Sequence, residues 1–248
     1  MKDMNKRLDD VLIKHASTVK SNYNAPWMDQ KPLSKKNANK FILGAIIDYQ
    51  IEANMAWDNA KRLSERILGD PDDLWEYILG TYTKDEWALK WRVFRVHRFP
   101  AAHNRIWRIG NEIVNRYNGD VRRIWHGKKP TAVLTSLEEM RFGPEISRMI
   151  VGVLLSYSEI EGKGDIKADS HVRTVLGRII NRELSTVEAR QIAQTIHPDN
   201  PWEIDIALYD IGKTYCLSDR CYCENCPVGK EEICEDYKLY KAQESSNK

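Results

Sequence analysis

The sequence predicts an all-α protein, and three of its features support this. Among its 248 residues are only 13 Gly and 9 Pro, the two residues that most often interrupt a helix. Apolar residues recur at helical spacing, and no stretch of useful length alternates as a half-buried strand does. Helix-capping patterns precede several of these apolar segments, so helices are expected along most of the chain.

Start and stop signals divide the chain into successive helices with short connectors. Thr83, Ser136 and Ser185 each stand three residues before a Glu, as in a capping box. Gly69-Asp70-Pro71 and Asn118-Gly119 are typical of helix ends. The expected helices cover residues 36–59, 60–68, 73–79, 87–96, 104–117, a short segment from 136, 147–157, 169–180, a segment from 185, and 202–214.

The composition is that of a globular protein, with 42% hydrophobic and 30% charged residues. The longest apolar runs, residues 41–47 and 149–155, are far shorter than the roughly 20 residues that span a membrane. The first residues are charged and amphipathic, without the apolar stretch of a secretory signal. We therefore expect an intracellular protein, cytoplasmic or at the nucleoid in a prokaryote, with no membrane partner.

Positive charge is concentrated in one part of the chain, although the net charge is only +2. Between residues 91 and 123, only Glu112 and Asp120 oppose a series of arginines. These arginines are Arg92, Arg95, Arg98, Arg105, Arg108, Arg116, Arg122 and Arg123. Such a stretch can hold phosphate groups. The alternative is a solvated helix face on which arginine stems cover apolar surface.

The cysteines are the most specific signal in the chain. All five lie in its final 33 residues: Cys216, Cys221, Cys223, Cys226 and Cys234. Because no secretory signal precedes them and the rest of the chain can form its own core, metal or cluster binding is favoured over disulfides. Structural zinc sites usually use two close cysteine pairs, whereas only Cys223 and Cys226 form one here. Four thiolates on a single loop suit an iron–sulfur cluster better.

The spacing Cys216-x6-Cys223-x2-Cys226-x7-Cys234 resembles the iron–sulfur loop of endonuclease III and MutY, whose usual pattern is C-x6-C-x2-C-x5-C. The first two spacings match and the last is two residues longer. This resemblance implies a [4Fe-4S] cluster held by Cys216, Cys223, Cys226 and Cys234. Cys221 is then the spare thiol, or replaces Cys216 as the weaker alternative.

A second resemblance lies upstream of the cysteines. Ala168-Asp169-Ser170-His171-Val172 is similar to the V-D-T-H-(I/V) segment of the same family, which implies that Asp169 is the catalytic aspartate. Cleavage of an N-glycosidic bond develops positive charge on the sugar, and a nearby carboxylate stabilises it. At about 4 Å and an effective dielectric near 20, the pair gains roughly 4 kcal/mol, or about three decades of rate. A plain helix N-cap is the alternative for Asp169, and the two roles are compatible.

The helix-hairpin-helix turn departs from the family pattern, L-P-G-V-G-(R/K)-K. Gly143 matches the first glycine of this phosphate-binding turn. Glu145 replaces the second glycine, and Pro144 removes one backbone donor. We expect Arg141 and Arg148 to compensate for the carboxylate and to contact DNA.

Ser147 stands where bifunctional members of the family carry their Schiff-base lysine. Its presence implies a monofunctional glycosylase, with Ser147 near the DNA and an activated water as the attacking group. Lys163 and Lys167, in the loop before Asp169, are the alternative source of lyase activity. The helix ending at Gln50 resembles the one that ends in L-S-A-Q, so Gln50 is expected to enter the duplex where the base has left the stack.

Together these resemblances imply a two-lobed helix-hairpin-helix glycosylase fold. Residues 33–161 would form a six-helix barrel lobe with the divergent hairpin, and residues 1–32 and 162–248 the cluster lobe. The implied activity is base-excision repair by a monomer acting on double-stranded DNA with a damaged or mismatched base. The alternatives are a bifunctional glycosylase with AP lyase activity and a non-catalytic DNA-binding protein of the same fold.

Overall fold

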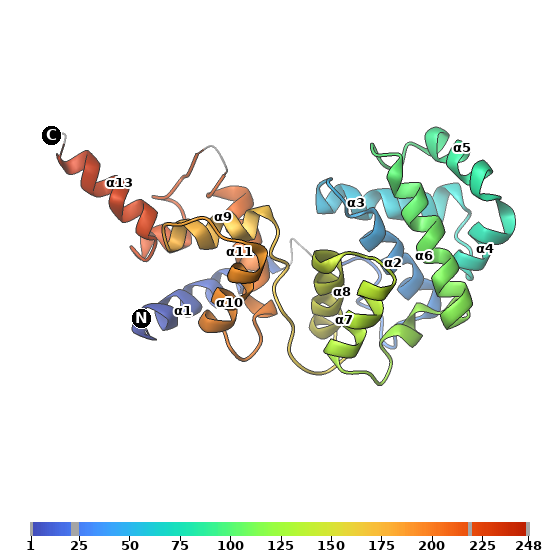
Figure 1. The fold of residues 1–248 in the computed structure, drawn as a ribbon, viewed down its shortest axis with the longest axis horizontal. Helices are drawn as coiled ribbons and strands as arrows, with labels where there is room; N and C mark the ends of the chain where they lie inside the picture. The colour runs from blue at the N-terminus through green and yellow to red at the C-terminus, as the bar shows by residue number, and fades with distance from the viewer. Residues whose placement is uncertain (1, 21–24, 218–219, 247–248) are drawn as a thin grey trace. The chain divides into compact units, whose positions relative to one another are not determined.

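The computed structural model describes residues 2–20, 25–217 and 220–246. In these residues every regular element is a helix, apart from one isolated antiparallel bridge between Cys216 and Cys221 (Figure 1). The all-α prediction is therefore confirmed. Residues 1, 21–24, 218–219 and 247–248, which the sequence assigns to the cluster lobe, lie outside this description.

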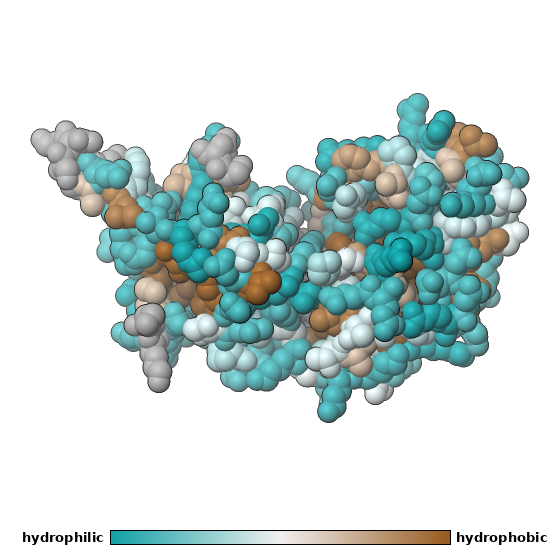
Figure 2. Space-filling model, in the orientation of Figure 1, coloured by the Kyte–Doolittle hydropathy of each residue, from teal (hydrophilic) through white to brown (hydrophobic). Residues whose placement is uncertain are grey.

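The chain divides into two compact units. The central unit is Ala25–Gly162, and the terminal unit combines Met1–Asn24 with Lys163–Lys248. None of the described helices is long and apolar enough to cross a membrane. On the face drawn in Figure 2, most of the surface is hydrophilic and apolar residues are scattered between charged ones.

The central unit is built around one buried helix. Its elements are α2 (Lys35–Ile47), α3 (Ala53–Lys61), the π-helix η2 (Arg62–Ile67), α4 (Leu74–Thr81), α5 (Lys84–Phe94), α6 (Ala101–Tyr117), the 3-10 helix η3 (Val121–Ile124), α7 (Pro130–Glu139) and α8 (Pro144–Ser156). Every residue of α2 from Ala38 to Ile47 is buried, because α3, α4, α6 and α8 pack around it. Residues 41–47 of α2 are apolar on all sides of the helix, which is stable only in such a central place.

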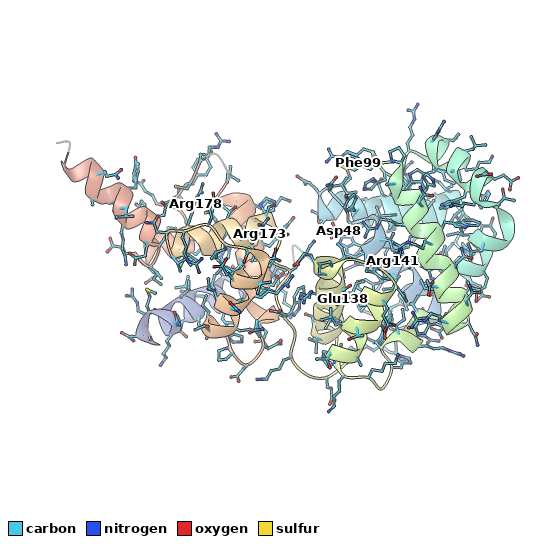
Figure 3. All side chains as sticks on the ribbon, in the orientation of Figure 1. Asp48, Phe99, Glu138, Arg141, Arg173 and Arg178 are labelled. Carbon is cyan, nitrogen blue, oxygen red and sulfur yellow. The ribbon has the colours of Figure 1, made fainter. Side chains whose placement is uncertain are left out.

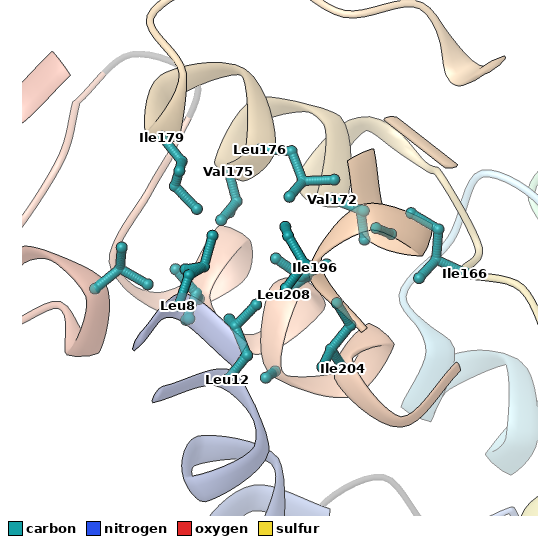
Figure 4. Packing of buried hydrophobic residues seen from close by; sticks show 14 of the residues in the cluster. Leu8, Leu12, Ile166, Val172, Val175, Leu176, Ile179, Ile196, Ile204 and Leu208 are labelled. Atoms are coloured by element: carbon teal, nitrogen blue, oxygen red, sulfur yellow. The ribbon is translucent and has the colours of Figure 1, made fainter. Parts of the chain in front are cut away.

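The terminal unit forms its own core from both ends of the chain. Its helices are α1 (Lys2–Val19), α9 (Ser170–Ile179), α10 (Thr186–Ile196), α11 (Trp202–Thr214), α12 (Pro227–Lys230) and α13 (Glu235–Ser246). Val172, Val175 and Leu176 of α9 meet Leu8 of α1 and Leu208 of α11 in one apolar cluster (Figure 4). This packing sets α9, which follows Asp169, against α11 and α1.

Four helix boundaries test the sequence expectations directly. The capping boxes at Thr83 and Ser185 are confirmed, with both reciprocal hydrogen bonds present. The box expected at Ser136 is wrong: α7 begins at Pro130, so Ser136 lies near its end. Proline is favoured at a first helical position, and here it starts the helix six residues earlier. The single helix expected over 36–59 is also interrupted, because Gln50 adopts a left-handed φ of 54° between α2 and α3.

Candidate functional site

Asp169 is the N-cap of α9. Its Oδ1 accepts hydrogen bonds from the backbone N–H groups of His171 at 2.9 Å and Val172 at 3.1 Å. Its backbone is extended, and the residue is half-buried. The carboxylate is thus held at the positive end of a helix, where backbone donors satisfy one of its oxygens.

The segment before Asp169 is anchored to α11 by a buried carboxylate. Oδ1 of Asp205 accepts a hydrogen bond from Lys167 N at 2.7 Å, and Asp205 is only 7% exposed. At the other end of α11, Gly212 approaches the first turn of α9 so closely that a Cβ on it would lie 2.8 Å from the His171 carbonyl oxygen. Sequence reasoning missed both residues. Two sequence signals could have identified them. Asp205 is an acidic residue on an otherwise apolar stripe of the helix, and Gly212 is a glycine inside a helix.

Basic side chains continue along α9 from Asp169. Ser170, Arg173 and Arg178 line a cavity of about 550 Å³ in the terminal unit, together with Arg182 and Asp236. Figure 3 labels Arg173 and Arg178 on α9. Arg178 lies 3.9 Å from Asp236, and Arg182 pairs with Glu188 at 2.6 Å. Arg173 has a buried Nε with no hydrogen-bond partner among the described residues. This face of α9 is therefore suited to an anion.

The hairpin turn lies in the central unit between α7 and α8. Arg141 and Gly143 adopt positive φ angles of 60° and 92°, which only the glycine accepts without strain. Arg141 is exposed (Figure 3). Arg148 donates to Glu138 at 3.2 Å and to the Pro144 carbonyl at 2.9 Å, so its guanidinium braces the turn.

The structure does not place Ser147 on the surface, where a DNA contact would require it. Its side chain is fully buried, because α8 packs this face against α2 and α7. The Oγ atom has no hydrogen-bond partner among the described residues. Gln50, by contrast, is exposed in the loop that follows α2.

Several arginines of the basic stretch have structural partners. Arg122 forms a two-pronged pair with Asp120 at 2.7 and 2.9 Å, and Arg116 lies 3.0 Å from Glu139. Arg105 and Arg108 donate to backbone carbonyls of the hairpin turn. The sequence predicted these two arginines only as part of a charged stretch. Their partners lie more than 30 residues further along the chain, so no local sequence signal indicates these contacts.

All five cysteines line one small cavity of the terminal unit, and all are free thiols. The other lining residues are mostly apolar and include Val175, Ile179, Ile211 and Val228. Arg178 Nη1 donates to Cys216 Sγ at 3.3 Å, while Cys221 is exposed, with its Sγ 2.7 Å from that of Cys223. Within the described residues, no three His, Cys, Asp or Glu side chains are placed to hold a metal ion directly.

The surroundings of Cys216, Cys223, Cys226 and Cys234 raise the pKa of each of these thiols. Burial raises the pKa of Cys216 and Cys226, and it raises the pKa of Cys234 to about 11. Burial, followed by the neighbouring Cys221 thiol, raises the pKa of Cys223. A metal ion reverses this preference because it binds thiolates and releases their protons.

Comparisons with known proteins place the fold. No protein-family model matches the chain, and no curated protein matches its sequence. Among solved structures, endonuclease III trapped as a covalent intermediate with DNA, in an estranged-adenine complex, matches with a TM-score of 0.65. A non-covalent endonuclease III–DNA complex matches at 0.64 and a thermostable thymine-DNA glycosylase at 0.66. Each alignment has 15% identity and covers 96% of this chain and 98% of the other.

Proposed function

We propose that this chain, which has the endonuclease III-type glycosylase fold, is a DNA glycosylase that excises a damaged or mismatched base from double-stranded DNA. The observation that carries the proposal is the placement of Asp169. It lies at the N-terminus of α9 on a segment tied to α11 through Asp205, so its carboxylate is held in one orientation before substrate binds.

Asp169 would act on the sugar. As the N-glycosidic bond breaks, the bonding electron pair leaves with the base, and C1′ becomes positively charged. The carboxylate stabilises this charge and takes a proton from the water whose oxygen bonds to C1′. This proton ends on the departing base, so the products are the neutral free base and an abasic site, and the Asp169 carboxylate is regenerated. No residue needs to form a covalent bond with DNA.

The monofunctional form is favoured by the residue at the lyase position. Ser147 carries no amine, and its side chain is fully buried. Of the two alternative amines, Lys163 Nζ donates to the Pro198 carbonyl at 3.2 Å, and Lys167 is half-buried. Borohydride treatment during the reaction tests this. We expect no trapped protein–DNA adduct, and an adduct lost in Lys163→Ala or Lys167→Ala would establish the bifunctional form.

Contacts to DNA would come from polar groups of each unit. In the central unit these are Gln50 and the hairpin turn, with Gly143, Arg141 and Arg148. In the terminal unit the face of α9 that carries Arg173 would hold a phosphate. Backbone amides at a glycine turn and arginine side chains are the usual phosphate donors.

The cysteine cavity would hold a [4Fe-4S] cluster, with Cys216, Cys223, Cys226 and Cys234 as ligands. The donor set supports this, because the four sulfurs line a single apolar cavity and such clusters are held by four thiolates. Gly229 supports it as well: a Cβ there would lie 2.1 Å from the Cys223 carbonyl, so the loop can wrap tightly only with glycine. Bound, the cluster would connect the segment that follows α11, through Cys216, to the loops around α12 that carry the other three cysteines.

Iron content and visible absorption of the purified protein test the cluster. We expect about four irons per chain, lost in Cys223→Ser and retained in Cys221→Ser. Retention of iron in Cys216→Ser and its loss in Cys221→Ser would instead make Cys221 the fourth ligand. Colourless protein without iron after anaerobic purification would refute the cluster.

Duplexes carrying uracil, thymine mismatches, oxidised pyrimidines or alkylated bases test the activity. After incubation, alkali converts abasic sites into strand breaks. We expect breaks with at least one lesion, and their absence with Asp169→Asn. One observation favours a non-catalytic DNA-binding protein instead: Pro144 and the half-buried Glu145 occupy the phosphate turn. Duplex binding without breaks on any lesion would support that second candidate.

A further inference from the structure

Arg105 lies between the two central-unit elements proposed to contact DNA. Its Cζ is 4.9 Å from the centroid of the Tyr49 ring, next to Gln50. Its Nη2 donates to the carbonyl oxygen of Phe142 at 2.8 Å, next to Gly143. One half-buried guanidinium on α6 therefore contacts both the Gln50 loop and the hairpin turn.

The Gln50 loop is held from the α5–α6 connection as well. His97 Nε2 lies 2.9 Å from the Tyr49 carbonyl, and His97 Nδ1 accepts from Phe99 N at 3.0 Å, which makes Nε2 the donor. Arg98 Nη2 donates to the Gln50 carbonyl at 2.5 Å. These bonds fix a non-glycine residue at a φ of 54°, a conformation that persists only where its surroundings impose it.

The aromatic rings of this region complete the support of the loop. The Tyr49 and Phe99 rings meet edge to face with centroids 6.2 Å apart, and the Arg98 guanidinium covers the Phe99 ring at 4.8 Å. Tyr49 thus lies between Phe99 and Arg105. The Gln50 side chain itself remains exposed, as a group that enters a duplex must be.

A second arginine of α6 also supports the hairpin turn. The carbonyls of Met140 and Arg141 each accept a hydrogen bond from Arg108 at 3.2 Å. Arg108 lies three residues after Arg105 on α6 and is likewise half-buried. Arg108 donates hydrogen bonds to the turn, whereas Arg105 donates to the turn and also lies over the Tyr49 ring.

We infer that Arg105 is a positioning residue that sets the separation between the hairpin turn and the Gln50 loop. When the hairpin turn binds a phosphate, Arg105 thereby places the Gln50 side chain where it can enter the duplex. This rests on the proposed function, of which it specifies the base-extrusion step. A planar guanidinium can stack by its face and donate by its edge at once, whereas an ammonium cannot. Arg105→Lys therefore keeps the charge and breaks the coupling.

The experiment uses the full-length protein and a duplex with 2-aminopurine beside a tetrahydrofuran abasic analogue, which needs no catalysis. The analogue has no base in the stack, so the fluorescence of 2-aminopurine increases when Gln50 enters the gap and disturbs the stacking of 2-aminopurine. At saturating protein we expect Arg105→Lys to lower this increase about fivefold or more, as Gln50→Ala does. The double variant should lose little more, because coupled residues are not additive. Affinity for undamaged duplex should change less than about twofold, since the charge remains.

Matched variants separate positioning from a general loss of structure. Arg108→Lys loses the bonds to the turn but keeps the Arg105–Tyr49 contact, so it should lower the fluorescence at saturation less than Arg105→Lys does. Tyr49→Ala removes the stack but not the Phe142 bond, and should reproduce Arg105→Lys. Thermal melting identifies any variant that unfolds. If Arg105→Lys unfolds, the fluorescence of Tyr49→Ala decides the outcome.

Wild-type fluorescence in both Arg105→Lys and Tyr49→Ala, or an additive loss in the double variant, would overturn the inference. So would a wild-type protein that produces no increase. A fluorescence increase that depends on Arg105, in a protein that excises no base from any lesion, would refute only the catalytic proposal.

Discussion

Replacing Asp169 by Asn separates catalysis from helix capping. Oδ1 of Asp169 accepts two backbone hydrogen bonds, at 2.9 and 3.1 Å, and an Asn side-chain oxygen can accept both. Asn is about as good an N-cap as Asp, so the substitution removes the charge and little else. Losing a negative charge at a helix N-terminus costs about 0.5 kcal/mol of stability. Losing its attraction to a cationic sugar costs roughly 4 kcal/mol at about 4 Å.

We therefore expect Asp169→Asn to excise its base about a thousandfold more slowly, with nearly unchanged unfolding. Asp169→Ala should be as slow, and less stable by about a further 1 kcal/mol because the cap is lost. Single-turnover excision at saturating protein and urea unfolding measure the two effects. An Asn variant within tenfold of the wild-type rate would refute the electrostatic role. Equal destabilisation by Asn and Ala would refute the capping role.

Three further predictions concern other residues. Gly212→Ala should lower the excision rate and destabilise the protein by about 2 kcal/mol, because the new Cβ would lie 2.8 Å from the His171 carbonyl oxygen. A urea unfolding curve identical to that of the wild type would contradict this. Arg173→Met should weaken duplex binding and reduce the salt dependence of log Kd by about one phosphate contact, and an unchanged slope would exclude a phosphate there. Backbone and side-chain bonds with Ser185 lower the pKa of Glu188 from 4.5 to about 2, so its contribution to stability is complete above pH 4.5 and lost as pH falls towards 2. In urea unfolding, Glu188→Gln should be less stable at pH 7 and less sensitive to acid below pH 4.5, and a profile parallel to wild type would contradict the assignment.

Local features could be predicted from the sequence because their determinants are neighbours in the chain. The boxes at Thr83 and Ser185 depend on residues three positions apart and form as expected. The Asp169 cap depends on the next three residues and also forms. The box at Ser136 failed because the same short pattern also fits the last turn of a helix that Pro130 had already started. A local signal cannot distinguish these two cases.

The sequence by itself determined the helical class, the clustering of the cysteines and the candidate carboxylate, since each is a matter of composition or close spacing. Only the tertiary structure decided that Ser147 is buried, that Asp205 and Gly212 set the start of α9, and that Arg105 and Arg108 hold the hairpin turn. These contacts join residues more than 30 positions apart. They form only when packed helices bring the residues together, so no spacing along the chain records them.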